Sequence, residues 1–291
     1  MNNLKINKYG YLKGVKIIDT DKGKFVVKKN KHCNRELFRY LETKNFVNFV
    51  NAYSYGDDYE IYPYVNNINL TDEERALDIV YIISLLHNKT TFYKTNDGDL
   101  IKKIYEEFND KLTYLSNYYD NMKTIIEEEK YTSPSGYLLL RNSTIIYRCI
   151  DEAKYFIDKW YQLIKEKKNY RVATCHNNLE LDHLLKEDNS YLISWDKACK
   201  CSPIYDVLSL YKSVYEKVDF FSLFEIYNTK YPLLEEEIYL LFALMLIPDK
   251  VLLSSREIIN TKNVYELTNY LMMTSNFISN YHSNNSNTKT N

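Results

Sequence analysis

Two different hydrophobic periods divide the chain near residue 66. Before that point, β-branched and other apolar residues are concentrated in short runs at 15–18 and 24–28, with turn residues between them. Such runs predict strands joined by a tight turn, where Gly23 is free to take a positive φ. After that point, apolar residues recur every three or four positions, which is typical of amphipathic helices. We therefore predict a β-rich N-terminal lobe over residues 1–65 and a helical C-terminal lobe over residues 66–281.

One helix is expected within the N-terminal lobe. Asn34 can cap a helix over residues 35–41, because its side chain accepts hydrogen bonds from the free amides of a first turn. Two short strands are expected near residues 51–55 and 59–64, and Pro63 would end the second of them. The lobe is thus predicted to be a small sheet with one helix.

The C-terminal lobe begins with a capping box at residues 71–74, in which the Thr71 hydroxyl and the Glu74 carboxylate satisfy free amides of a helix start. Strands return briefly at 171–175, 184–186 and 191–195. Four or five further helices are expected from residue 204 to about residue 281. The polar residues 282–291 are expected to form a disordered tail.

Composition and charge exclude several classes of protein. The formal net charge of −1 over 291 residues argues against a general polyanion binder, so no nucleic-acid partner is expected. No run approaches 18 apolar residues and the N-terminus lacks the apolar core of a signal peptide, so no membrane insertion is expected. The five cysteines are scattered, and the C-x-C pair of Cys199 and Cys201 has no second pair at zinc spacing. We predict reduced thiols in a cytoplasmic protein and treat the C-x-C pair as incidental.

A polar loop lies between two of the short strands of the C-terminal lobe. Residues 175–183 read C-H-N-N-L-E-L-D-H, and residues 192–196, which follow a short turn, read L-I-S-W-D. Pro203 and Asp206 then open the next helix. Kinase-like enzymes use this order of strand, loop, strand, turn and strand to carry a base and a metal-binding carboxylate.

These segments resemble the aminoglycoside and choline kinase-like phosphotransferases, and among them the spore-coat kinase-like proteins of low-GC bacteria. That family has the pattern H-x-D-x-x-x-x-N, then an apolar strand ending in I-D-W or I-D-F, then a Pro and an Asp that opens a helix. His176, Trp195, Pro203 and Asp206 match this pattern. The resemblance implies an α+β, bilobal protein-kinase-like fold with a small β-rich N-lobe and a large, mainly helical C-lobe.

The same alignment places other residues at the positions that carry the chemistry. Asn178 stands where the family has its catalytic Asp, and a neutral amide cannot accept a proton near pH 7. His183 replaces the Asn that binds magnesium, and Ser194 replaces the metal-binding Asp. Magnesium prefers carboxylate and water oxygens, so a nitrogen and a single neutral hydroxyl are poor substitutes. The three changes together predict loss of efficient phosphoryl transfer.

Neighbouring carboxylates could compensate for these changes. Asp182 and Asp196 lie within two residues of the lost positions, as does Glu180. Asp196 would return to the face of Ser194 if the strand continued, because side chains alternate along a strand. A relocated metal site at Asp182 and Asp196 is therefore one alternative, and ordinary polar loop residues are the other.

On the nucleotide side, the resemblance assigns Lys28 to the strand lysine that contacts the α and β phosphates. Glu36 would be its partner on the helix, although the short gap between them leaves Glu42 or no partner as alternatives. A solvent-facing strand-end lysine is the competing interpretation of Lys28. Residues 9–14, with two glycines four apart, are either a phosphate-covering loop or a plain hairpin.

The retained residues have structural roles by the same resemblance. His176 is expected to anchor the loop by hydrogen bonding to backbone, and Asp206 is expected to cap its helix or hold the loop. His87, near the end of the first helix of the C-terminal lobe, is expected to be a packed structural histidine.

Three hypotheses about function follow. The leading one is a pseudokinase of this family, not an enzyme but a binding or scaffold module, which the resemblance links to spore or envelope assembly. Its partner would be an unidentified protein or small molecule, and it would bind a nucleotide without magnesium or bind none. The rival is an active small-molecule phosphotransferase that uses ATP and magnesium through displaced carboxylates. The third, a helical interaction protein unrelated to kinases, requires the match from His176 to Asp206 to be a coincidence.

Overall fold

The computed structural model describes residues 5–12, 15–29, 34–56 and 58–288. The chain packs into two compact units, each treated separately below. Unit 1 comprises Met1–Phe92 and Val172–Pro232, and unit 2 comprises Tyr93–Arg171 and Leu233–Asn291. The change from strands to helices falls between residues 63 and 72, as predicted. Because the two units group residues by packing, the lobe boundary near residue 66 stays a prediction.

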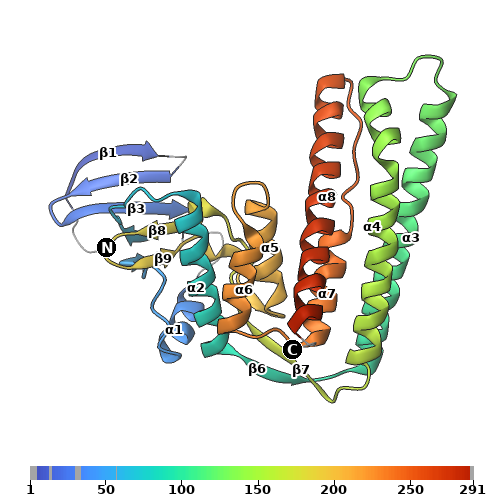
Figure 1. Cartoon of the computed structure of the whole chain (residues 1–291). Coiled ribbons are helices and arrows are strands. Elements are labelled where there is room, and N and C mark those ends of the chain that lie inside the picture. Colours follow the sequence, from blue (N-terminus) through green and yellow to red (C-terminus); the bar gives the residue numbers. More distant parts are fainter. Residues whose placement is uncertain (1–4, 13–14, 30–33, 57, 289–291) are drawn as a thin grey trace. The chain divides into compact units, whose positions relative to one another are not determined.

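Unit 1 contains an antiparallel sheet of five strands in the order β1-β2-β3-β5-β4 (Figure 1). The strands are β1 (Ile6–Leu12), β2 (Val15–Thr20), β3 (Gly23–Lys29), β4 (Ser54–Tyr55) and β5 (Tyr59–Pro63). The predicted runs at 15–18 and 24–28 are β2 and β3, and Gly23 between them has φ +112°. This sheet is the β-rich part that the kinase-like prediction requires before residue 66.

Strand β1 has no hydrophobic pattern, and its antiparallel pairing with β2 agrees with the plain hairpin that is one alternative for residues 9–14, as far as these residues are described. Its described side chains are exposed, because backbone pairing with β2 holds it instead of burial. Tyr9 to Tyr11 of the predicted phosphate-covering loop lie in this strand. Lys13 and Gly14 lie outside the described residues.

Helix α1 (Arg35–Thr43) forms where it was predicted, but the expected cap by Asn34 is wrong. The backbone of Asn34 has φ −81° and ψ 5°, outside the extended region that capping favours, and its side chain makes no cap hydrogen bond. That side chain instead lines a cavity described below.

The rest of unit 1 carries the polar loop. Helix α2 (Asp72–Thr90) starts with the predicted capping box: Glu74 N donates to Thr71 Oγ1 at 3.2 Å, and Thr71 N donates to Glu74 Oε2 at 2.9 Å. Helix α2 contacts α5 and α6 and the β8–β9 hairpin. Strands β6 (Phe92–Thr95) and β7 (Asn169–Cys175) belong to unit 1 only through residues 92 and 172–175. The remaining elements of unit 1 are η1 (Leu181–His183), β8 (Leu184–Lys186), β9 (Ser190–Leu192), η2 (Trp195–Lys197), β10 (Cys199–Cys201), α5 (Ile204–Val214) and α6 (Phe220–Lys230). Strand β7 lies between β10 and β6 in a second sheet.

An aromatic cluster joins the N-terminal helix of unit 1 to the end of the polar loop. The rings of Phe38 and Phe49 stack at 4.5 Å, and the Trp195 ring lies 6.1 to 6.4 Å from those of Phe38, Phe46 and Phe49. All four side chains are buried. Burial of aromatic rings stabilises a fold strongly. The packing of Trp195 in this cluster therefore fixes the position of the residues beside it.

Unit 2 is a set of helices in which α4 contacts α3, α7 and α8 (Figure 1). The helices are α3 (Gly98–Glu128), α4 (Pro134–Ile164), α7 (Glu235–Leu246) and α8 (Glu257–Thr288). Arg171 pairs with Glu237 in this unit through Nε and Oε1 at 3.0 Å and a second contact between Nη2 and Oε2. Among the described residues, four helices follow residue 204, in agreement with the prediction.

The predicted tail begins too early, because α8 continues to Thr288. His282 packs its ring 5.9 Å from that of Phe156 and 5.8 Å from that of Phe242, and Ser283 Oγ donates to Ser279 O at 2.9 Å. Contacts with neighbouring helices thus extend a helix that its polar composition does not favour. Residues 289–291 lie outside the described residues.

Candidate functional site

The polar loop leaves the end of β7 and is held by a single carboxylate. Asp206 Oδ2 accepts a hydrogen bond from His176 N at 2.8 Å, and Asp206 Oδ1 accepts one from Asn177 N at 2.6 Å. Asn177 has φ +55°, a left-handed conformation that asparagine tolerates better than most residues. Asp206, on α5, therefore sets the path of the backbone that follows Cys175.

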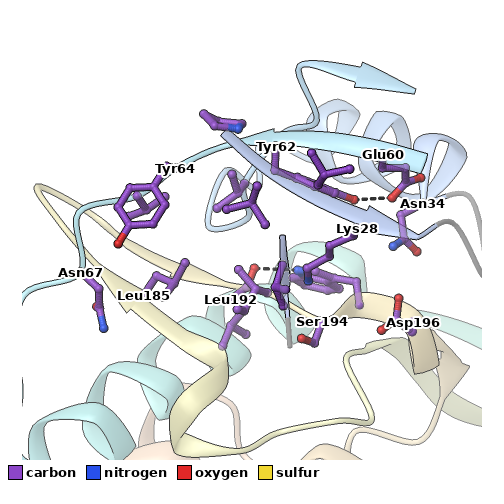
Figure 2. Close-up of a pocket in the computed structure, with 18 of the residues that line it drawn as sticks. Lys28, Asn34, Glu60, Tyr62, Tyr64, Asn67, Leu185, Leu192, Ser194 and Asp196 are labelled. Carbon is purple, nitrogen blue, oxygen red and sulfur yellow. Dashed lines mark hydrogen bonds between the residues drawn. The ribbon is translucent and has the colours of Figure 1, made fainter. Parts of the chain in front are cut away.

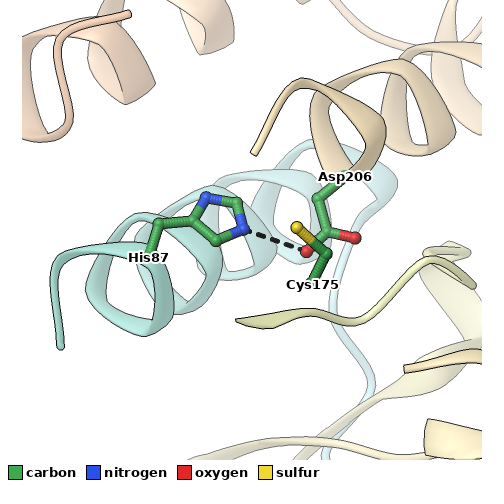
Figure 3. A group of neighbouring side chains, drawn as sticks. All are labelled: His87, Cys175 and Asp206. Atoms are coloured by element: carbon green, nitrogen blue, oxygen red, sulfur yellow. Dashed lines mark hydrogen bonds and ion pairs between the residues drawn. The ribbon is translucent and has the colours of Figure 1, made fainter. Parts of the chain in front are cut away.

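Asp206 is completely buried and belongs to a cluster with His87 and Cys175 (Figure 3). His87 Nε2 lies 3.1 Å from Asp206 Oδ2, and His87 Nδ1 lies 2.8 Å from the Tyr227 hydroxyl. Burial would raise the pKa of Asp206, but the hydrogen bond and charge of His87 and the loop contacts hold that pKa below its ordinary value. Ligand atoms of the three residues lie within 4.8 Å of one another, but the carboxylate already accepts two loop amides and faces His87. We assign the cluster to bracing the loop, the role expected for Asp206 and His87.

His176 makes the backbone hydrogen bond expected of a loop anchor. Its Nε2 donates to Ile193 O at 2.9 Å, and its ring packs at 4.6 Å against the edge of Trp195. The side chain is fully buried, and its Nδ1 has no hydrogen-bond partner among the residues that the structure describes. Burial lowers the pKa of His176 to about 4, although the charge of Asp206 opposes the shift.

This lowered pKa predicts a loss of stability in mild acid. The unfolded chain binds a proton at His176 below about pH 6.5, whereas the folded protein does so only near pH 4. The contribution of neutral His176 to the free energy of unfolding is therefore complete above pH 6.5. It is lost as the pH falls toward 4, by about 3 kcal/mol in total. We expect the free energy of unfolding by urea, followed through Trp fluorescence, to fall less between pH 7 and pH 4 in His176→Gln than in the wild type. Equal pH dependence of the free energy of unfolding in the two proteins would contradict a lowered pKa of His176.

The three residues that replace the catalytic positions contact one another. Asn178 Nδ2 donates to Ser194 O at 3.3 Å, and His183 Nδ1 donates to the Asn178 carbonyl oxygen at 2.6 Å. Ser194 has φ +67°, so the chain turns sharply there. Asn178 and His183 thus hold the loop together by hydrogen bonds, and none of the three supplies a carboxylate.

A cavity of about 660 Å³ lies between the five-stranded sheet and this loop, within unit 1. Its polar residues include Lys28, Glu60, Ser194 and Asp196, and Figure 2 shows Lys28 between the strand of Glu60 and the segment of Ser194. Apolar side chains from both sides complete the walls, namely Val15, Ile17, Val26, Val27, Leu185 and Leu192. The volume is in the range of small-molecule sites.

Lys28 is one of three cationic residues that line this cavity, together with Lys29 and Arg75. Burial lowers its pKa, and the nearby charges of Asp196 and Glu60 oppose that shift. Among the described residues, no carboxylate lies within 4.0 Å of its ammonium group, which lies 5.8 Å from the centre of the Tyr62 ring. The cavity therefore contains a partly desolvated cation without a direct counter-ion.

Glu36 does not contribute to the cavity, so its predicted partnership with Lys28 is not formed. It is exposed on α1, whereas Glu60 of β5 is the cross-strand partner of Lys28. Glu60 is 4% exposed, and its Oε2 accepts a hydrogen bond from the Tyr62 hydroxyl at 2.6 Å. Its buried Oε1 has no hydrogen-bond partner in the described part of the chain. Burial and the bond to Glu60 raise the pKa of Tyr62. No sequence signal identified Glu60, because neither strand by itself determines how β3 and β5 align.

The two candidate substitute carboxylates both line the cavity, although both are exposed. The strand does not continue to Asp196, so alternation does not place it on the face of Ser194: β9 ends at Leu192 and residues 195–197 form a single 3₁₀ turn. That turn nevertheless brings Asp196 close enough to Lys28 to affect its pKa. Asp182 and Asp196 would offer carboxylate oxygens to magnesium, and within the described part of the chain the buried Oε1 of Glu60 has no hydrogen-bond partner.

A second cavity of about 520 Å³ lies on the other side of the loop. Asn178 and Asp182 line it, and Asp182 lines the first cavity as well. The remaining charged residues are of both signs: Asp72, Glu180, Lys197, Lys212 and Lys217. Asn178, which stands at the position of the family's catalytic Asp, therefore faces a space that could hold a second small molecule.

Among the described helices, none has both the length and the apolar character of a membrane span. No family model matches the sequence, and comparison with curated proteins finds no match. Solved structures do match. An aminoglycoside phosphotransferase from Alicyclobacillus acidocaldarius subsp. acidocaldarius DSM 446 has a TM-score of 0.70 at 11% identity, with 97% of this chain and 94% of that chain covered.

Two further structures have lower scores. Spectinomycin phosphotransferase APH(9)-Ia in its AMP-bound complex has a TM-score of 0.48 at 13% identity, with 92% of this chain and 93% of that chain covered. Choline kinase LicA from Streptococcus pneumoniae has a TM-score of 0.47 at 14% identity, with 91% and 92% covered. The similarity to the aminoglycoside phosphotransferase with the TM-score of 0.70 confirms the predicted kinase-like α+β fold.

Proposed function

We propose that this protein is a nucleotide-binding pseudokinase with the fold of the aminoglycoside and choline kinase-like phosphotransferases. The observation that carries the proposal is the ammonium group of Lys28, which lies in a cavity without a direct counter-ion. An anionic ligand would supply the missing charge. Apolar walls from β2, β3 and the β8–β9 hairpin would suit the flat base of a nucleotide, with its phosphates toward Lys28.

Loss of transfer follows from the residues beside this cavity. Phosphoryl transfer needs an oriented acceptor and a metal that neutralises the developing charge. Asn178 is neutral, and its amide is bonded to the backbone of Ser194. Ser194 and His183 offer no carboxylate, so the polyphosphate would lack its usual metal ligands at these positions. The protein would therefore bind a nucleotide with little need for magnesium and act through a protein or small-molecule partner.

One observation favours an active enzyme as the second candidate. Asp182 and Asp196 line the same cavity as Lys28, and the charge of Asp196 acts on Lys28. Two carboxylates at the phosphate end could hold magnesium in place of the lost ligands, and Asp182 also faces the second cavity. A spore or envelope process stays a prediction of the sequence resemblance.

A thermal-shift titration with ATP distinguishes the two candidates. At an ATP concentration ten times Kd, binding stabilises the native state by about 1.4 kcal/mol, a rise in Tm of about 2–4 °C for a chain of this size. We expect this rise both with magnesium and with EDTA, together with no ATP turnover above that of a buffer blank.

Asp196→Ala is the matched variant, because Asp196 is exposed and its loss should leave the fold intact. The pseudokinase predicts an unchanged or slightly larger ATP shift in this variant, since a negative charge near the phosphates is removed. Magnesium-dependent turnover that Asp196→Ala abolishes would establish the active enzyme instead. Absence of any shift under all conditions would contradict both candidates.

A further inference from the structure

The first cavity has a second fixed cation, apart from Lys28. Arg75 of α2 lines the cavity and lies against the backbone of two neighbouring segments. Its Nε donates to Leu70 O at 3.3 Å, and its Nη1 donates to Leu184 O at 3.3 Å and to Leu181 O at 3.4 Å. All three acceptors are carbonyl oxygens, so they hold the guanidinium in place without neutralising its charge.

The Arg75 guanidinium keeps free hydrogen-bonding capacity. An arginine side chain is always charged and carries five N–H donors. The three bonds to carbonyl oxygens use the donors of Nε and Nη1. Within the part of the chain that the structure describes, Nη2 has no acceptor and no carboxylate lies within 4.0 Å of the guanidinium. An anion in the cavity would satisfy both the charge and these two donors.

Asn67 supplies another donor from the segment before α2. Its side chain lines the cavity, and its Oδ1 accepts a hydrogen bond from Lys186 N at 2.8 Å. This bond identifies the oxygen of the amide and fixes the orientation of the side chain. The amide nitrogen Nδ2 has no acceptor among the described residues.

These two side chains lie at one end of the cavity. Arg75 binds the carbonyl of Leu184, and Asn67 binds the amide of Lys186, so both are attached to the short strand β8. Figure 2 shows Asn67 well apart from Lys28. We call the group of Arg75 and Asn67 the Arg75 end of the cavity.

The acidic residues nearby leave the charge of this end uncompensated. Asp78, three residues after Arg75 on α2, is paired with Lys186 through Oδ2 and Nζ at 3.0 Å. Asp182 also lines the cavity, but it is exposed and forms no ion pair with Arg75 in the described structure. Water screens the charge of an exposed carboxylate, so Asp182 opposes an anion here only weakly.

We propose that the first cavity binds a nucleotide that carries a second phosphate on its ribose, and that Arg75 and Asn67 recognise this phosphate. The inference rests on the proposed function, in which the 5′ phosphates face Lys28 and the base lies against the apolar walls. The 2′ and 3′ oxygens of the ribose are then the positions that carry an anion away from Lys28. A guanidinium binds phosphate through two parallel hydrogen bonds, and an arginine accommodates the ribose 2′-phosphate of NADP in dinucleotide-binding folds.

Three adenosine nucleotides test this inference by isothermal titration calorimetry. AMP, adenosine 2′,5′-bisphosphate and adenosine 3′,5′-bisphosphate share the base, the ribose and the 5′ phosphate, so they differ only in the added group. We expect one bisphosphate to bind about 10- to 100-fold more tightly than AMP, because hydrogen bonds between charged groups contribute this much affinity. The tighter of the two identifies the ribose oxygen that carries the phosphate.

Variants of two arginines assign the preference to a residue. Arg75→Met should raise the Kd of the preferred bisphosphate to that of AMP and leave the Kd of AMP unchanged. Arg75→Lys keeps the charge but not the fork of donors, so it should retain only part of the preference. Arg39→Met is the matched control, because Arg39 of α1 is exposed and does not line the cavity. It should retain the full preference.

A footprint of the wild type tests the contact without a variant, which matters because Arg75 also holds three carbonyl groups. Phenylglyoxal modifies arginine and blocks tryptic cleavage, so modified Arg75 gives the peptide 45–89 in place of 45–75 and 76–89. At ten times its Kd, the bisphosphate should slow this modification about tenfold, because only the free protein reacts. AMP at ten times its own Kd should have little effect, and Arg39 should react at the same rate throughout.

Each contrary result has a separate meaning. Equal Kd values for AMP and both bisphosphates in the wild type would overturn this inference and leave the nucleotide site in place. A preference that persists in Arg75→Met, or a modification rate of Arg75 that the bisphosphate does not change, would overturn the assignment to Arg75. Binding of none of the three nucleotides would overturn the proposed function and this inference with it.

Discussion

Replacement of Asp206 by alanine is expected to lower the free energy of unfolding by about 3–5 kcal/mol, the largest effect of any single change considered. The carboxylate is completely buried and holds the amides of His176 and Asn177 while it faces His87. Its removal leaves buried donors without acceptors, and each such group costs about 1–3 kcal/mol. Equilibrium urea unfolding, followed through the fluorescence of Trp195 and Trp160, measures the loss.

Two further variants make this test specific. Asp206→Asn keeps the size of the side chain but replaces one acceptor oxygen with an amide donor. We therefore expect it to lower the free energy of unfolding by about half as much as Asp206→Ala. Asp196→Ala, which removes an exposed carboxylate ten residues away, should change the stability by less than about 0.5 kcal/mol. If Asp206→Ala proved as mild as Asp196→Ala, the bracing role would be refuted.

Lys28→Met is expected to abolish most of the ATP-induced rise in Tm. A hydrogen-bonded ion pair between an ammonium group and a phosphate contributes about 1.5–3 kcal/mol, so its loss should weaken ATP binding about 10- to 100-fold. Stability without ligand should be unchanged or slightly higher, because the variant no longer buries an uncompensated charge. Isothermal titration calorimetry and thermal shift measure the two effects separately.

Lys24→Met provides the matched control for this prediction. Lys24 lies on the same strand, β3, but is exposed and does not line the cavity. Glu60→Gln should act in the opposite direction and strengthen ATP binding, because it removes a buried negative charge near Lys28. Equal loss of binding in Lys24→Met and Lys28→Met would show that ATP does not bind in this cavity.

The order of elements in the N-terminal part could be predicted because most of it follows local patterns. Strands β2 and β3 carry β-branched apolar runs, and α2 carries its own capping box. The failures have equally local causes. Asn34 has the wrong backbone angles for a cap, and the polar end of α8 is extended by packing of His282.

The candidate site was only partly predictable. The loop, its anchor His176 and the lysine Lys28 were identified from motif positions, and the structure places all of them beside the first cavity or in its wall. Glu36 was predicted as the helix partner of Lys28, with Glu42 or no partner as alternatives, whereas the structure places Glu60 opposite Lys28, because the pairing of β3 with β5 joins residues 32 positions apart. The cysteines were treated as incidental, because a C-x-C pair does not show that Cys175 lies opposite on the neighbouring strand.

Chemical capacity is a property of each residue, and the sequence was sufficient to define it. An amide at position 178 cannot act as a base and a hydroxyl at position 194 cannot replace a carboxylate, whatever surrounds them. Proximity and protonation depend on the folded chain. Strand register and packing set the proximity of Lys28, Glu60 and Asp196, the burial of Asp206, and the pairing of Cys175 with Cys199. Those quantities depend on contacts between distant segments, so they arise only when the sheet and the loop have packed together.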